Sequence, residues 1–131
     1  MMEVIAASAI MMVALTAMYI SIVFAEKSVQ RTYHERCASL IAAGELDWQY
    51  FYQKTQKRLD IFHPTVVEIT KLPDGRPLRG QIEMRRLQIG YTVVAGKMIY
   101  HQPVEIVVSW TEPGDKSEKR DIVVRGDFYP Q

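Results

Sequence analysis

The sequence predicts an α+β protein in which one long N-terminal helix packs on a four- to five-stranded antiparallel sheet. No charged side chain occurs between Val4 and Ala25, which favours a membrane-spanning first part of that helix. From there to about residue 58, apolar residues recur every three or four positions, as on an amphipathic helix. After His63-Pro64 the apolar period changes to two, which indicates strands.

The uncharged segment is long enough to cross a bilayer. At about 1.5 Å per residue, a helix over residues 4–25 is about 33 Å long, close to the thickness of the hydrocarbon core. A secretory signal peptide has a shorter apolar region preceded by a basic flank, and Met1-Met2-Glu3 supplies no such flank. A buried core helix would need more surrounding protein than the rest of this chain provides. We therefore expect residues 1–25 to form a membrane-spanning or filament-core helix.

The second part of the predicted helix carries an apolar stripe. Its members are Val29, Tyr33, Cys37, Leu40, Ile41, Leu46, Trp48, Phe51 and Tyr52. Gly44 interrupts the pattern and marks a kink or a break, because glycine disfavours helix. The stripe from Val29 to Trp48 is the expected cover for the apolar face of the sheet. Cys37 is the only cysteine, so it forms no disulfide within the chain and is expected to pack as a small apolar residue.

Strands are expected over residues 65–129. Val67 and Ile69 alternate with a polar residue, and LPDGRPL then indicates a turn. Two further alternating pairs, Ile82 with Met84 and Leu87 with Ile89, are out of phase. A β-bulge at Arg85-Arg86 would keep both pairs on one face. The chain would thus comprise residues 1–25 and a head of residues 26–131, with the sheet following the amphipathic helix.

Two segments give the clearest strand signals. YTVV-AGK-MIY predicts a hairpin with a tight glycine-containing turn. VEIVVSWT places Val104, Ile106, Val108 and Trp110 on one face, and in DIVVRGDFYP the residues Ile122 and Val124 are expected to face the core.

Three stretches carry a resemblance to a known family: MMEVIAASAIMMVALTAMY, RCASLIAAGELDW and VEIVVSWTEPGDKSEKRDIVV. The first is similar to the glutamate-led N-terminal segment of type IV pilins and type II secretion pseudopilins. The other two resemble the second half of the family's long helix and its closing hairpin. Met1 and Met2 would stand at the family's third and fourth positions, and Glu3 at its glutamate. The stretches cover most of the chain, and the first is the most specific.

The resemblance implies a minor pilin or pseudopilin, a non-enzymatic subunit of a type IV pilus or of a type II secretion pseudopilus. Such a subunit assembles through its N-terminal helix, and Glu3 would attract the α-amine of a neighbouring subunit. The implied partners are other pilins or pseudopilins in a hetero-oligomeric filament, together with inner-membrane assembly proteins. The implied location is the inner membrane, single-pass, with the C-terminal part in the periplasm or on the extracellular filament.

The direction of insertion is read in two ways. Lys27, Arg31 and Arg36 follow the apolar segment and no basic residue precedes it, a bias that by itself places the C-terminal part in the cytoplasm. The family's basic leader would reverse that bias. This leader and the Phe-Thr after it do not precede Met1 here, so leader cleavage and N-methylation stay open.

An alternative needs no filament. In it, the chain is a single-span membrane protein whose extracytoplasmic sheet domain binds a partner, and Glu3 only marks the interfacial end of the helix. Ala6, Ala7, Ala9, Ala14 and Ala17 would let helices approach closely. Alanine is also common in membrane helices, so both readings remain.

The residues do not predict catalysis, a cofactor or nucleic-acid binding. The three histidines have no His, Cys or carboxylate at metal-ligand spacing, and the formal net charge is only +1. The one weak candidate for an ion site is a Ca²⁺ site in the loop that carries Glu112, Asp115 and Asp121. Basic residues lie among these acids, which favours a solvated loop instead.

Overall fold

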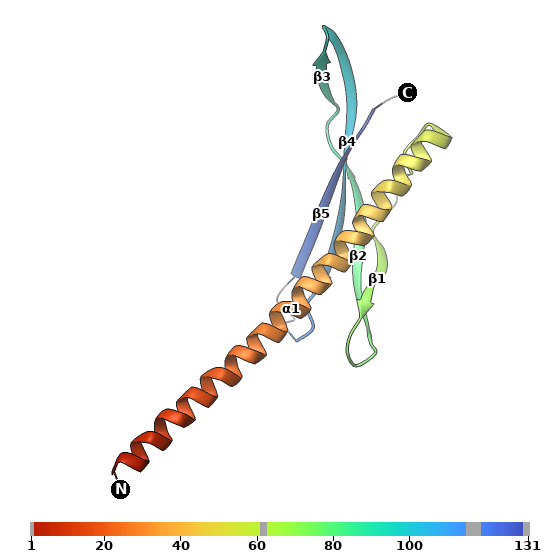
Figure 1. The fold of residues 1–131 in the computed structure, drawn as a ribbon. Helices are drawn as coiled ribbons and strands as arrows, with labels where there is room; N and C mark the ends of the chain where they lie inside the picture. The colour runs from red at the N-terminus through yellow and green to blue at the C-terminus, as the bar shows by residue number, and fades with distance from the viewer. Residues whose placement is uncertain (1, 61–62, 115–118, 130–131) are drawn as a thin grey trace. The chain divides into compact units, whose positions relative to one another are not determined.

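The computed structural model describes residues 2–60, 63–114 and 119–129, and within them it confirms the α+β class. One helix is followed by a five-stranded antiparallel sheet (Figure 1). The elements are α1 (Met2–Gln56), β1 (Thr65–Lys71), β2 (Pro77–Arg86), β3 (Gly90–Val94), β4 (Lys97–Thr111) and β5 (Lys119–Phe128). The chain divides into two compact units, Met1–Tyr33 and His34–Gln131, and the second is called the head below.

Helix α1 continues through Gly44, so the expected break does not form. No atom within 4 Å would meet a Cβ added at this glycine, which shows that the helix needs no glycine here for packing. The helix ends at Gln56, two residues before the expected end. Lys57 adopts a left-handed conformation with φ of 55°, and its N–H donates to the Gln53 carbonyl, 2.8 Å away. This conformation at the residue after the helix is a common way to end a helix.

The sheet is built around β4, which pairs with three other strands. Its neighbours are β2 and β3 on a path of order β1-β2-β4-β3, and β5 pairs with it as well. Ile106 of β4 lies between Met84 of β2 and Val124 of β5 in the two registers. The apolar residues that the sequence assigned to one face of β4 are indeed buried: Val104, Ile106, Val108 and Trp110.

The β-bulge predicted at Arg85-Arg86 is wrong. The pairing of β2 with β4 runs from Gly80 to Arg86 without a shift of register. The change of apolar phase instead marks the end of β2, because residues 87–89 link β2 to β3 outside any strand. The described register irregularity lies between Glu68 and Thr70, in the pairing of β1 with β2.

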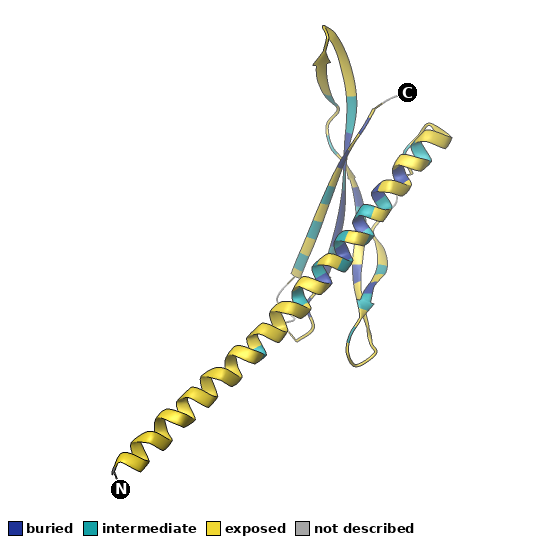
Figure 2. Ribbon diagram, viewed as in Figure 1, coloured by how far each residue is buried: buried dark blue, intermediate teal, exposed yellow. Residues whose placement is uncertain are grey.

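The side of α1 that covers the sheet differs from the predicted stripe. Buried positions recur four apart at His34, Ala38, Ala42 and Leu46, and the two alanines are 0% exposed (Figure 2). Of the predicted stripe, Leu46 is buried, while Cys37 and Ile41 are half-buried against the core and Tyr52 is half-buried. The other members are exposed: Val29, Tyr33, Leu40, Trp48 and Phe51.

Small residues set the distance between helix and sheet. Ala38 and Ala42 face the core residues of the strands, and short side chains at a contact let a helix axis lie close to its neighbour. On β5, a Cβ added at Gly126 would lie 2.8 Å from Leu46 Cδ1 and 3.0 Å from the Tyr50 hydroxyl. The absence of a side chain at Gly126 thus leaves room for Leu46 and Tyr50. The ring of Tyr50 stacks on that of Phe128, with ring centroids 4.2 Å apart.

One buried amide joins the end of the helix to the segment after it. Gln49 is 0% exposed, and its Oε1 accepts from the Asp60 N–H at 3.0 Å. Its Nε2 donates to the Asp60 carbonyl at 2.9 Å and to Glu45 Oε1 at 3.0 Å. The side chain thus satisfies its own polar atoms while it fixes the chain that leaves α1.

Candidate assembly surface

The unit Met1–Tyr33 exposes apolar side chains around its helix. Val4, Ile10 and Phe24 are 72%, 71% and 73% exposed, and none of the most apolar window of α1 is buried within the chain. This helix is the one among the described residues that is long and apolar enough to cross a membrane. Glu3 is exposed and lies in its first turn, where a carboxylate complements the helix dipole.

Three hydroxyl groups of the apolar part of this helix are satisfied within it. Ser8 donates to the Ile5 carbonyl at 2.8 Å, Thr16 to Met12 at 2.8 Å, and Ser21 to Ala17 at 2.9 Å. A polar group without a partner is costly in an apolar environment, whereas a hydroxyl bonded to its own helix is tolerated. The segment can therefore be surrounded by lipid or by other helices without leaving these hydroxyls unpaired.

A shallow hollow lies on one side of the same helix. It has a volume of about 400 Å³ and is lined only by apolar residues, namely Ala9, Ile10, Val13, Ala14 and Ala17. Small side chains between larger ones let a second helix approach its backbone closely. Three of the small residues that were predicted to let helices approach closely, Ala9, Ala14 and Ala17, thus line the same hollow.

Within the head, α1 also keeps an uncovered apolar side. Leu40 is 73% exposed, although Ala42, two positions later, is fully buried. Two positions in an α-helix differ by about 200° in direction, so the two residues face opposite ways. Trp48 and Phe51 are exposed as well, with ring centroids 5.5 Å apart. The uncovered side, defined as Leu40, Trp48 and Phe51, is open for a partner.

The weak Ca²⁺ candidates do not meet in one site among the described residues. Glu112 is only 6% exposed, and its two oxygens lie 3.0 Å from His34 Nδ1 and 2.9 Å from the Trp110 indole N–H. Asp121 instead lines a groove that Glu112 does not line. Asp115 lies outside the described residues. No group of three or more His, Cys, Asp or Glu side chains that could hold a metal occurs in the described ranges.

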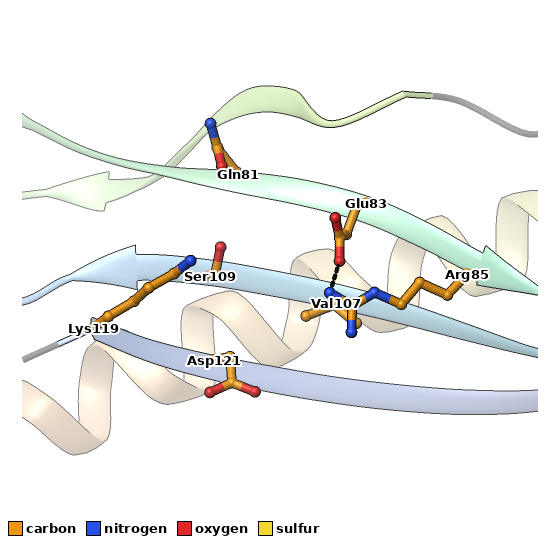
Figure 3. Close-up of a pocket in the computed structure, with 7 residues that line it drawn as sticks. All are labelled: Gln81, Glu83, Arg85, Val107, Ser109, Lys119 and Asp121. Atoms are coloured by element: carbon orange, nitrogen blue, oxygen red, sulfur yellow. Dashed lines mark ion pairs between the residues drawn. The ribbon is translucent and has the colours of Figure 1, made fainter.

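The groove that contains Asp121 has mixed charge. Its volume is about 320 Å³, and it is lined by Gln81, Glu83, Arg85, Val107, Ser109, Lys119 and Asp121 (Figure 3). Glu83 and Arg85 form an ion pair across one end. Acidic and basic side chains alternate here, as on the solvated face of an antiparallel sheet, and the arrangement selects no particular ligand charge.

Two polar clusters of the head were missed from the sequence. His34 and Gln49 lie on the sheet-facing side of α1, where the pattern suggested only solvated or unassigned positions. Their partners Glu112 and Asp60 are far along the chain or in an irregular segment, so no local spacing could reveal them. The available signal was the four-residue spacing of His34 with Ala38 and Ala42, which a search for large apolar residues passes over.

A long N-terminal apolar helix on an antiparallel sheet is compatible with a pilin-like fold. Comparison with protein-family models, with curated proteins and with solved structures finds no match to this chain.

Proposed function

We propose that this chain is a minor pilin or pseudopilin, a subunit that assembles into a filament through its N-terminal helix. One observation carries the proposal: the apolar window of α1 is entirely unburied within the chain. Apolar surface contributes about 25 cal/mol per Å² when it leaves water, so a helix bare on all sides requires lipid or other helices around it. In the proposed assembly, this helix leaves the lipid and becomes surrounded by helices of other subunits.

The uncovered side of the head part of α1 favours assembly over simple anchoring. A membrane anchor needs apolar residues only within the bilayer, and the rest of the helix would need them only toward the sheet. Leu40, Trp48 and Phe51 lie on neither kind of surface. In the proposed filament these residues contact helices of neighbouring subunits, which accounts for large apolar side chains opposite the buried alanines.

Glu3 has a specific role in the proposed assembly. A carboxylate near an apolar helix end costs free energy unless a cation meets it, and the attraction strengthens as the local dielectric constant falls. In the proposed filament the cation is the α-amine of a neighbouring subunit, and the pair fixes the stagger between helices. The hollow lined by Ala9, Ala14 and Ala17 would admit the neighbouring helix.

The remaining parts of the proposal follow from this role. The protein is non-enzymatic, its partners are other pilins or pseudopilins and inner-membrane assembly proteins, and the filament is hetero-oligomeric. It serves a type IV pilus or a type II secretion pseudopilus. Before assembly it resides in the inner membrane as a single-pass protein with its head in the periplasm.

The test separates assembly from insertion. We expect Glu3→Leu to abolish recovery of the chain in sheared filaments from producing cells, while its amount in the membrane fraction stays unchanged. Glu26→Gln is the matched control, since it removes an exposed carboxylate from the same helix, and it should assemble normally. If Glu3→Leu assembles as well as the parent, or if the parent never leaves the membrane fraction, the chain acts instead as an anchored binding domain.

A further inference from the structure

The hairpin formed by β3 and the first part of β4 is a two-stranded arm. Residues 97–101 of β4 pair with β3, whereas its pairing with β2 and β5 begins at Val104 and Gln102. Figure 1 shows the arm extending past the other strands of the head. Its turn is Ala95-Gly96, with φ of 49° and 77°, the positive pair that a two-residue type I′ hairpin requires.

One face of the arm is entirely apolar or aromatic. The register places Tyr91 opposite Tyr100 and Val93 opposite Met98, and residues directly opposite share a face. All four side chains are more than half exposed, from 54% to 64%. An isolated two-stranded hairpin is marginally stable in water, and this arm has neither a helix over its apolar face nor a third strand among the described residues.

The outer edge of β3 lacks the features that protect the other edges. In β1, a register irregularity between Glu68 and Thr70 interrupts the edge. In β5, charged side chains recur along the edge. The sequence of β3, GYTVV, contains no charge and no proline, and its pairing with β4 has no irregularity. An unprotected edge strand is a template for pairing with another strand.

We propose that β3 pairs with β3 of a second copy of this chain, antiparallel and centred on Thr92, to join two heads. In this register Tyr91 lies opposite the partner's Val93, Thr92 opposite the partner's Thr92, and Gly90 opposite the partner's Val94. All five residues of each strand are paired. Registers centred on Tyr91 or Val93 would pair only three.

This register makes the apolar face continuous across the two copies. Each copy contributes its Tyr91 and Tyr100 next to the Val93 and Met98 of the other, so two four-residue apolar rows cross the new sheet. In a two-residue hairpin the residues that flank the turn form a hydrogen-bonded pair, and such pairs alternate with non-hydrogen-bonded ones. The backbone N–H and C=O groups of Tyr91 and Val93 therefore point outward. They would form four hydrogen bonds with the same groups of the partner.

Charge and accessibility both make the edge of β3 a better site for pairing with a second copy than the edge of β4. If two β4 segments paired about Ile99, Lys97 would lie directly opposite His101 of the other copy. Two basic side chains would then be neighbours. In the β3 pairing, these two residues are separated by the two β3 strands, about 14 Å at 4.8 Å per strand. The β4 edge is also partly covered, because the ring of Tyr129 lies 5.8 Å from that of His101.

The contact is a small two-fold interface. A stable interface buries about 800 Å² per partner, more than five residues at a strand edge supply, so the association is weak and concentration-dependent. A two-fold contact is complete at two copies and does not extend further. It also does not depend on what α1 does, and its failure would leave the proposed role of α1 untouched.

Cysteine cross-linking of the full chain in detergent micelles tests this register, with Cys37→Ala as the background. The Thr92 pair is non-hydrogen-bonded, with Cα atoms about 4.5 Å apart, within the range of a disulfide. Thr92→Cys should therefore give at least about ten times more disulfide-linked dimer than Val94→Cys, whose two copies would lie about 14 Å apart. Val94 is the matched control because it is exposed on the same face of the same strand.

A second pair of variants excludes random collision. In the Thr92→Cys chain, Val93→Lys places a charge in the apolar rows and should reduce the dimer about tenfold or more. Val66→Lys, on the exposed part of the β1 edge, should leave it unchanged. Equal cross-linking of Thr92→Cys and Val94→Cys, or none for either, would overturn the proposal. A dimer from Ile99→Cys that exceeds that from Thr92→Cys would assign the contact to β4 instead.

Discussion

His34 Nδ1 lies 3.0 Å from a carboxylate oxygen of Glu112, a residue 78 positions further along the chain. The pair is buried, at 5% and 6% exposure, and the second Glu112 oxygen accepts from the Trp110 indole at 2.9 Å. Next to it, Arg120 of β5 pairs with Glu35 of α1. Two consecutive residues of the helix are thus held by the closing hairpin, His34 by Glu112 directly after β4 and Glu35 by Arg120 of β5.

This relationship predicts that Glu112 contributes to the stability of the head. Glu112→Leu removes the acceptor of a buried indole N–H and the carboxylate beside His34, and should lower the free energy of unfolding by roughly 1–3 kcal/mol. Glu112→Gln keeps one acceptor oxygen and should cost less. Urea unfolding of the full chain in detergent, followed by tryptophan fluorescence, measures both. Equal losses for Leu and Gln would show that the hydrogen bonds contribute little.

The close approach of α1 to β5 predicts opposite effects for two glycine substitutions. Gly126→Ala places a methyl group 2.8 Å from Leu46 Cδ1, so it should destabilise the head by about 1–3 kcal/mol through overpacking. Gly44→Ala meets nothing within 4 Å in the middle of α1 and should stabilise it by about 0.5–1 kcal/mol. Thermal unfolding compares them. Adding Leu46→Ala should reduce the cost of Gly126→Ala, and strict additivity would contradict the contact.

The Gln49 amide predicts a loss that is specific to its hydrogen bonds. Gln49→Leu keeps most of the side-chain volume but leaves the Asp60 N–H without its acceptor, and should cost about 1–3 kcal/mol of unfolding free energy. Gln56→Leu, at the exposed end of α1, is the control and should change it little. Hydrogen exchange at the Asp60 amide should accelerate in Gln49→Leu. Unchanged exchange would show that another group protects this amide.

The phenol of Tyr50 predicts a loss of stability in alkali. Burial raises its pKa above the ordinary value of 10.0, and the nearby Asp127 carboxylate raises it further. Since the folded state holds the proton more tightly than the unfolded state, this contribution is complete below pH 10.0 and is lost as the pH rises through the higher folded pKa. In Tyr50→Phe, the free energy of unfolding should fall less between pH 9 and 11. An identical slope in both chains would assign the loss to other groups.

Because one side of α1 is buried and the other exposed, we expect substitutions on the buried side to change stability and those on the exposed side to change assembly. Leu40→Ala should change the unfolding free energy of the head by less than about 0.5 kcal/mol, because the side chain is 73% exposed. Ala42→Leu, on the buried side, should cost about 1–3 kcal/mol because no space is left for the larger side chain. Under the proposed function, Leu40→Ala lowers filament recovery. Destabilisation by Leu40→Ala would show that this residue has a partner within the head.

The strands were predictable because their patterns are local. Alternation along β4 identified Val104, Ile106, Val108 and Trp110, and the glycine-containing turn identified the β3–β4 hairpin. The packing side of α1 was not predictable in the same way. The side of α1 that packs on the sheet contains His34, Ala38 and Ala42, whereas the large residues Leu40, Trp48 and Phe51 lie on the uncovered side. A search for large apolar residues therefore does not identify the packing side. The His34–Glu112 pair could not be predicted, since it depends on a tertiary contact across most of the chain.

Because β4 lies at the centre of the sheet, the core of the head forms only after most of the chain has been synthesised. The surface of α1 that includes Ala38 and Ala42 is synthesised before its cover, which includes Trp110 and Phe128, more than 60 residues further along the chain. Contacts so distant in sequence form slowly, and domains are synthesised from the N-terminus onward. Both sides of the helix are therefore bare on the ribosome until β5 is made. Transiently exposed apolar surface of this kind is prone to aggregation, so the nascent chain is most vulnerable before its last strand has formed.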